Sequence, residues 1–123
     1  MSNQQINRIR IFEYEAPYTR GYGITKRILE AEWAKDGGRE QFSLGNLKKP
    51  GIFDCLDSVA GRTAISELVQ VAGIESVVVC NYEIIVHIAG VFDWADVEAE
   101  VLNIIMNNFF SGTHVDVQGL DKA

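Results

Sequence analysis

The chain has 123 residues and a mass of 13.7 kDa, which fits one domain with a hydrophobic core and leaves no room for a second. Because 47% of the residues are hydrophobic, only 2 are proline and the charges are mixed, a disordered or collagen-like chain is excluded. No apolar run reaches the roughly 18 residues of a membrane span, and the first residues lack the apolar segment of a signal peptide, so we expect a cytoplasmic protein without membrane contact.

The formal net charge of −6 is unevenly distributed. Residues 1–50 carry nine Lys or Arg against six acidic residues, whereas residues 51–123 carry two against eleven. The acidic second half repels phosphate groups, so a nucleic-acid surface would have to use cations of the first half. These cations are Arg8, Arg10, Arg20, Lys26, Arg27, Lys48 and Lys49. They do not cluster and alternate with glutamates, which favours solvated positions over a nucleic-acid partner.

The first half of the chain predicts strands. Residues 1–7 are polar and are expected to form a flexible tail, and residues 8–14 have the alternation and β-branched content of a strand. The segment 17–23, with its proline and glycines, predicts a loop before a second alternating strand over 24–33.

The glycines at 37 and 38 predict a tight turn, and residues 39–44 predict a short returning strand. Residues 45–58 predict an irregular loop.

The hydrophobic period changes in the second half. Apolar residues recur at helical spacing from about Val59, and Gly73 stands where a helix commonly ends. Residues 74–80 and 83–89 predict a hairpin around Asn81-Tyr82. A second helix is predicted after Asp93 as N-cap, with one apolar stripe formed by Trp94, Val97, Val101, Ile104, Ile105 and Phe109. Residues 114–117 predict a brief extended segment or a tail.

This order predicts a single α+β domain over residues 8–123. Its antiparallel or mixed sheet has about four to five strands, and both helices pack on one face.

Four segments between about Gly61 and Ile105 form a further pattern: Ala64-Ile65-Ser66-Glu67-Leu68, Val71-Ala72-Gly73-Ile74-Glu75-Ser76-Val77, Tyr82-Glu83-Ile84-Ile85-Val86 and Asp93-Trp94-Ala95-Asp96-Val97. With these segments the stretch resembles the amino-terminal domain of Nfu/NifU-type iron-sulfur scaffold proteins. The segments cover a little over a third of the chain. The family's Thr-Pro-Asn-Pro-Asn-like loop is replaced here by residues 16–21, and the segment 34–58 is longer than usual.

In that family the cluster ligands lie on a Cys-x-x-Cys of a separate domain, and this motif is absent here. The resemblance therefore implies a stand-alone, non-enzymatic interaction module, accessory to iron-sulfur cluster assembly without binding the cluster. It implies a protein partner or self-association.

The two cysteines form no recognisable metal or cofactor site. Cys55 and Cys80 are separated by 24 residues and have no histidine at short ligand spacing, so we expect two free thiols, no bound metal and no cofactor. A thiol-dependent enzyme would need Cys80 or Cys55 beside a base such as His87. The predicted hairpin places Cys80 and His87 about four residues apart along the sheet, roughly 13 Å, which is too far for a hydrogen bond. We expect no catalytic residues.

Two further features have simple structural interpretations. Gly21-Tyr22-Gly23 lacks the third glycine and the following helix of a dinucleotide fingerprint, and is interpreted as a turn. Trp94, at the start of the second helix, is interpreted as a core lid over the hairpin rather than a ligand-stacking residue.

The hairpin register yields the candidate binding face. It places Val77, Val79, Ile84, Val86 and Ile88 under the helices. The opposite face receives Ser76, Val78, Cys80, Glu83, Ile85 and His87, which are our candidate partner-binding residues. An uncovered face would expose Val78 and Ile85 and would indicate a partner or a self-contact. Alternatively, the amino-terminal segment or the 45–58 loop covers them.

Overall fold

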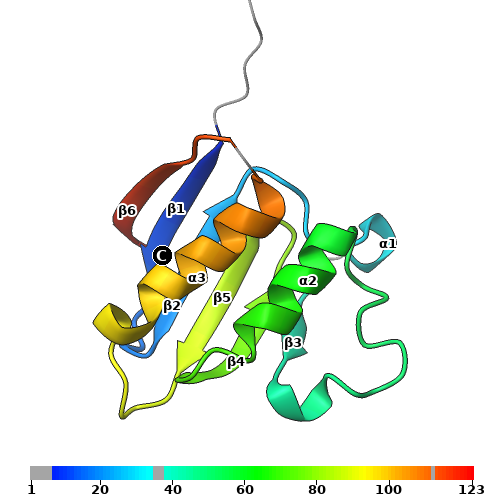
Figure 1. Ribbon diagram of the computed structural model, residues 1–123, viewed down its shortest axis with the longest axis horizontal. Helices are drawn as coiled ribbons and strands as arrows, with labels where there is room; N and C mark the ends of the chain where they lie inside the picture. The colour runs from blue at the N-terminus through cyan, green and yellow to red at the C-terminus, as the bar shows by residue number, and fades with distance from the viewer. Residues whose placement is uncertain (1–6, 35–37, 112) are drawn as a thin grey trace, which may run out of the picture.

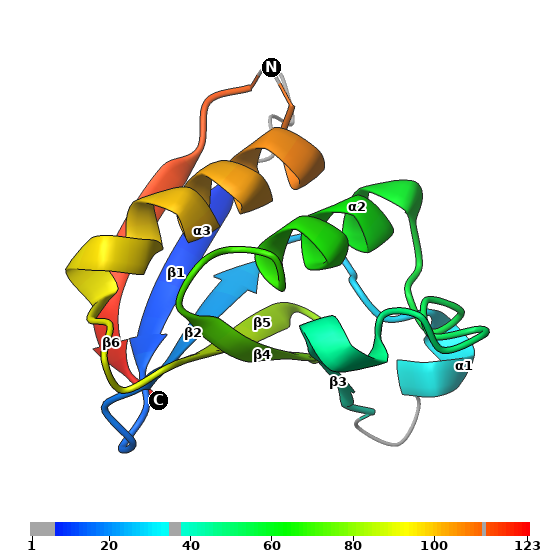
Figure 2. The same cartoon turned by 60° about the horizontal axis from the view of Figure 1, so that its bottom comes forward.

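The computed structural model describes residues 7–34, 38–111 and 113–123, and within them a mixed six-stranded sheet carries two long helices on one face (Figures 1 and 2). The elements are β1 Arg8–Glu13, β2 Thr19–Ile24, α1 Ala31–Ala34, β3 Glu40–Phe42, the 3₁₀ helix η1 Leu44–Asn46, α2 Val59–Leu68, β4 Ile74–Val79, β5 Glu83–Ile88, α3 Trp94–Phe109 and β6 Asp116–Lys122. The strand order is β3-β4-β5-β2-β1-β6. Only the β1–β6 pair is parallel among these neighbours. The predicted α+β class is confirmed, with one strand more than expected.

The core lies between the sheet and the α2–α3 layer. The five predicted inward residues, Val77, Val79, Ile84, Val86 and Ile88, are at most 2% exposed. The buried helix residues are Gly61, Ala64, Ile65 and Leu68 of α2 and Val97, Val101, Ile105 and Phe109 of α3. Each set recurs at the three- and four-residue spacing that puts side chains on one side of a helix. The helix layer therefore covers one side of the sheet, as predicted.

Helix α3 begins at a reciprocal cap. The Asp93 carboxylate accepts a hydrogen bond from the Asp96 backbone N–H at 3.3 Å, and the Asp96 carboxylate accepts one from the Asp93 N–H at 3.1 Å. The acidic side chains also lie at the positive end of the helix dipole. The N-cap predicted at Asp93 is confirmed.

Helix α2 ends earlier than predicted. Its last residue is Leu68, and the chain continues in tight turns in which Gln70 and Val71 donate to carbonyls three residues back. Gly73 has a φ of +98° and leads into β4 instead of ending the helix. Tightening of the final turn, which apolar spacing does not reveal, accounts for the difference.

The second strand was predicted in the wrong place. β2 covers residues 19–24, where a loop was expected, and most of the predicted strand 24–33 lies outside the sheet. The correction has a packing cause, because Tyr22 is fully buried beneath α3 while Gly21 and Gly23 leave space on the opposite face for side chains from neighbouring strands. Beyond β2, Leu29 makes a single bridge with Leu56.

The two edge strands were only partly foreseen. β3 lies within the predicted strand 39–44 but pairs with β4, not with the second strand. The predicted turn at 35–38 lies largely outside the described residues. β6 runs parallel to β1, and Arg10 forms an ion pair with Asp121 across them at 2.9 Å. Every residue of β6 is exposed, so it lacks the apolar alternation from which strands are predicted.

The predicted amino-terminal tail, residues 1–7, falls mostly outside the described residues. Asn7 is described, and its side chain donates to the Thr113 hydroxyl at 2.8 Å while its carbonyl accepts from the Asp116 N–H.

Among the described residues, no helix combines the length and hydropathy needed to cross a bilayer.

The left-handed backbone at Gly73 yields a stability prediction. A Cβ at this position would lie 2.8 Å from the Phe92 ring, in a conformation that L-residues disfavour by about 1–2 kcal/mol. Gly73→Ala should therefore lower the free energy of unfolding by about 2 kcal/mol or more in urea titrations. Gly45→Ala is the control, because a Cβ there meets only the Ser43 hydroxyl at 3.9 Å. Equal stability of the two variants would contradict this account.

Candidate functional site

The face of the sheet opposite the helices, which we call the open face, carries the six predicted partner-binding residues. Ser76 pairs with His87 and Val78 with Ile85, while the Cys80 N–H donates to the Glu83 carbonyl. This is the predicted register, and it places all six side chains on the open face, since residues that alternate with the buried ones point the other way.

The open face is less exposed than its apolar residues led us to expect. Ile85 is only 5% exposed, while Val78 is half-buried. Tyr14, at the end of β1, lies over Gly21, which pairs with Ile85. The amino-terminal segment thus supplies an aromatic cover beside Ile85.

The loop over 45–58 packs elsewhere. Its Phe53 stacks on the buried Phe42 at 5.9 Å between ring centroids, and its Leu56 belongs to the core. Among the described residues, the cover beside Ile85 comes from Tyr14, directly after β1, and Val78 stays partly accessible.

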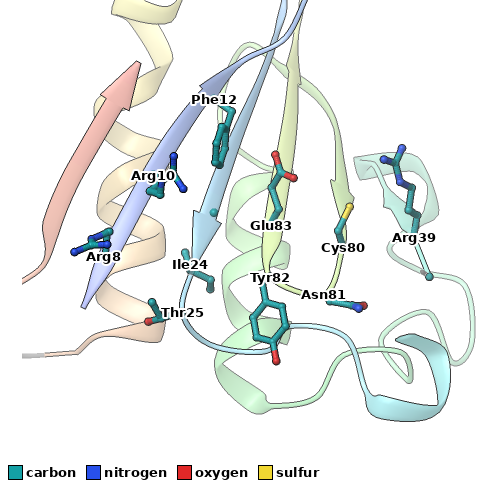
Figure 3. A pocket seen from close by; sticks show the side chains of 12 residues that line it. Arg8, Arg10, Phe12, Ile24, Thr25, Arg39, Cys80, Asn81, Tyr82 and Glu83 are labelled. Carbon is teal, nitrogen blue, oxygen red and sulfur yellow. The ribbon is translucent and has the colours of Figure 1, made fainter. Parts of the chain in front are cut away.

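One end of the open face is hollowed. A depression of about 580 Å³ lies where β1 begins, β2 ends and the β4–β5 turn reverses the chain (Figure 3). Its lining residues are Arg8, Arg10, Phe12, Gly23, Ile24, Thr25, Gly38, Arg39, Cys80, Asn81, Tyr82 and Glu83. Gly23 helps to form it, because a Cβ there would lie 3.1 Å from the Phe12 ring. The depression brings together four segments that are distant in sequence.

The depression is cationic in a protein that is acidic overall. Three arginines and one glutamate line it, against a net charge of −6 for the chain. Arg10 is engaged by Asp121 and lies 5.0 Å from the centre of the Phe12 ring. Within residues 7–34, 38–111 and 113–123, Arg8 and Arg39 form no ion pair. We call Arg8 and Arg39 the uncommitted arginines, because neither has an ionic partner among the described residues.

Two buried polar atoms near this end have no hydrogen-bond partner among the described residues. They are Nε of Arg8, a donor, and Oδ1 of Asn81, an acceptor. Such unsatisfied buried polar atoms cost free energy in the folded protein.

Tyr14 holds the Glu83 carboxylate over Gly21 of β2. The Tyr14 hydroxyl donates to the Glu83 carboxylate at 2.7 Å. Burial, followed by the hydrogen bond and the charge of Glu83, raises the pKa of Tyr14 well above its ordinary value. The phenol therefore remains a neutral donor at physiological pH. Gly21 makes this contact possible, since a Cβ there would collide with the carboxylate.

Cys80 and His87 are not brought together. The observed register separates them by four pairs along β5, and His87 instead lies 2.9 Å from the Thr19 hydroxyl through Nδ1. Burial raises the pKa of Cys80, while the charge of Arg39 opposes this shift. The thiol is therefore protonated at neutral pH and has no imidazole base within reach.

Cys55 is removed from the open face. It is 3% exposed, and its thiol lies 3.8 Å from the Ile52 carbonyl. Burial, with a contribution from the charge of Glu40, raises its pKa to about 11. Neither thiol has the low pKa of an activated nucleophile.

The remaining cations of the first half are dispersed. Arg20 forms an ion pair with Glu98 at 2.8 Å on the helix side, and Lys26 lies 5.4 Å from the ring centre of Phe110. Arg27 approaches the Tyr82 ring at 5.8 Å. These contacts agree with the interpretation of scattered surface positions.

Trp94 has a structural role. Its indole N–H donates to the Pro17 carbonyl at 3.0 Å, and the Arg20 guanidinium lies 5.0 Å from the ring centre. These contacts place it at the entry to β2, whereas the prediction put it over the hairpin. Gly21 and Gly23 lie within β2, where they form neither a turn nor a dinucleotide loop.

The described residues bring no three His, Cys, Asp or Glu side chains together in a way that could hold a metal ion.

No family model matches the chain, and no curated protein matches it.

Sequence reasoning identified Cys80 and Glu83 but missed the rest of the depression. Arg8 and Arg10 were weighed only as nucleic-acid contacts, and Arg39, Phe12 and Tyr82 were not selected. Alternation in 8–14 already put Arg8, Arg10 and Phe12 on one face, which was the available signal. The misplaced second strand concealed that this face adjoins the hairpin turn.

The Cys55 thiol yields a pH prediction. Its pKa is about 11 in the folded protein against about 9 unfolded, so the unfolded state releases its proton first and stability falls as the pH rises above 9. Between pH 8 and pH 10 this loss should be about 1 kcal/mol. Urea titrations of Cys55→Ala should show a loss smaller by that amount, and identical pH dependence in both proteins would contradict the burial-raised pKa.

Proposed function

We propose that the chain is a non-enzymatic interaction module of the cytoplasm that binds a protein partner, or a second copy of itself, through the open face of its sheet. The observation that carries this proposal is the contrast between the two faces. One is sealed by α2 and α3, whereas the other combines a half-buried Val78 with a cationic depression. Accessible apolar surface beside uncommitted charge is typical of a docking site.

The resemblance to the amino-terminal domain of Nfu/NifU-type scaffolds supports a more specific role. We propose an accessory function in iron-sulfur cluster assembly in which the module contacts the machinery without holding the cluster. The resembling segments run through α2, the hairpin and the start of α3, and the hairpin carries the open face. The partner-binding residues in this proposal are Ser76, Val78, Cys80, Glu83, Ile85 and His87.

An enzymatic role has less support. Cys80 and His87 are too far apart to share a proton. Burial also raises the pKa of the Cys80 thiol and of the Cys55 thiol. Binding a partner through the open face requires neither an activated thiol nor a base.

The open-face proposal predicts the outcome of capture from the native cells. Tagged wild-type protein should retain a specific partner, or should elute as a dimer in size-exclusion chromatography. Val78→Lys places a charge in the middle of the open face and should reduce this association by at least about tenfold, the effect of one buried contact worth 1.4 kcal/mol. Val91→Lys is the matched control, because Val91 is 90% exposed and follows β5 in a loop.

A second variant guards against misfolding. Ser76→Lys changes a half-buried polar position of the same face and removes no apolar packing. Circular dichroism melts should show that the variants remain folded. Association that is unchanged in both folded open-face variants would disprove the proposal.

A further inference from the structure

We infer that the depression at the turn end of the open face binds an extended peptide in which acidic residues flank a central apolar or aromatic residue. This inference rests on the proposed binding function and specifies the class of partner. The placement of charge and of apolar surface in the depression supports it.

The two uncommitted arginines stand at opposite sides of the depression. Arg8 belongs to β1, and Arg39 immediately precedes β3, with strands β4, β5 and β2 between them (Figure 3). The order β3-β4-β5-β2-β1 contains four interstrand steps, which amount to about 19 Å at about 4.8 Å per step. An extended chain rises about 3.3 Å per residue, so about six residues cross this distance.

Aromatic surface lies around the middle of the depression, beside the Glu83 carboxylate. Phe12, whose ring lies against Gly23, and Tyr82 contribute it from two sides (Figure 3). This arrangement suits an aromatic or aliphatic side chain inserted between the two anionic groups.

Charge complementarity selects the sign of the ligand. Three arginines face one carboxylate in the depression, and that carboxylate is already engaged by Tyr14. A carboxylate of the ligand can form paired hydrogen bonds with a guanidinium group, which favours glutamate and aspartate side chains beside Arg8 and Arg39.

A nucleic acid is the weaker fit. The basic set is small, Glu83 lies in the same depression, and the chain as a whole carries a charge of −6. Continuous phosphate backbones would be repelled beyond the immediate depression.

The test uses a fluorescein-labelled peptide with the sequence Glu-Asp-Ser-Phe-Ser-Asp-Glu and the 123-residue chain. Fluorescence anisotropy should show saturable binding with a dissociation constant of about 100 μM or lower, weakening as salt is raised. A peptide with Gln and Asn in place of the four acids, and one with Ser in place of Phe, should each bind at least about tenfold more weakly, the equivalent of 1.4 kcal/mol.

Variants of the protein locate the site. Arg8→Gln and Arg39→Gln should each weaken binding about tenfold, since each removes one charge-assisted contact. Arg62→Gln is the matched control, because Arg62 is exposed on α2, on the other side of the sheet. Each lining arginine is accessible at least in part, and melts of the variants should match the wild type.

Several results would overturn the inference. These are no saturable binding up to about 1 mM peptide, equal binding of the neutral peptide, insensitivity to both lining arginines, and tighter binding of a labelled single-stranded oligonucleotide of ten nucleotides. If the peptide fails while Val78→Lys still abolishes cellular association, only the peptide specificity is lost and the open face remains the binding surface. If both fail, the proposed function falls as well.

Discussion

The one-sided burial of the central hairpin is the constraint on which the other features depend. The inward valines and isoleucines of β4 and β5 can leave water only beneath α2 and α3, whose apolar stripes match them. Once this face is sealed, strand alternation sends Ser76, Val78, Cys80, Glu83, Ile85 and His87 to the other face, which none of the described helices covers. The candidate site is thus a consequence of how the core is closed.

Aromatic residues of β1 and of the segment directly after it pack on the open face where β2 has no side chains. Gly21 and Gly23 remove side chains from β2, and Tyr14 and Phe12 of the β1 segment occupy the resulting space. Tyr14 hydrogen-bonds Glu83 and helps to shield Ile85, whereas Phe12 borders the cationic depression. Gly21 therefore makes room for the cover beside Ile85, and Gly23 makes room for the Phe12 ring that borders the depression.

Much of the fold could be predicted because its signals are local. The hairpin, α3 with its Asp93 cap and the apolar stripe of α2 each follow from periodicity and capping chemistry within a few residues. β2 was misplaced because glycines usually mark turns, and only contacts with β1 and β5 explain why they lie in a strand here. β6 was predicted only as a brief extended segment or a tail over 114–117, because an exposed edge strand is held by backbone pairing, which leaves no hydrophobic pattern.

The candidate site could be predicted only in part for the same reason. The hairpin residues follow from a register set by two turn residues, but the depression needs Arg8, Phe12 and Arg39 to meet that turn across four strand pairs. Such nonlocal contacts depend on the sheet order, which one sequence does not fix. Among the described residues Arg8 and Arg39 have no ionic partner, and this too depends on the folded arrangement.

Amide hydrogen exchange on the tagged protein, free and in the complex that it forms in its own cells, tests the central claim most directly. If the side of the sheet away from the helices is the working surface, complex formation should slow exchange in β4, β5 and residues 80–83 and leave the outer faces of α2 and α3 unchanged. Slowing confined to α2 and α3, or none anywhere in a stable complex, would contradict the account.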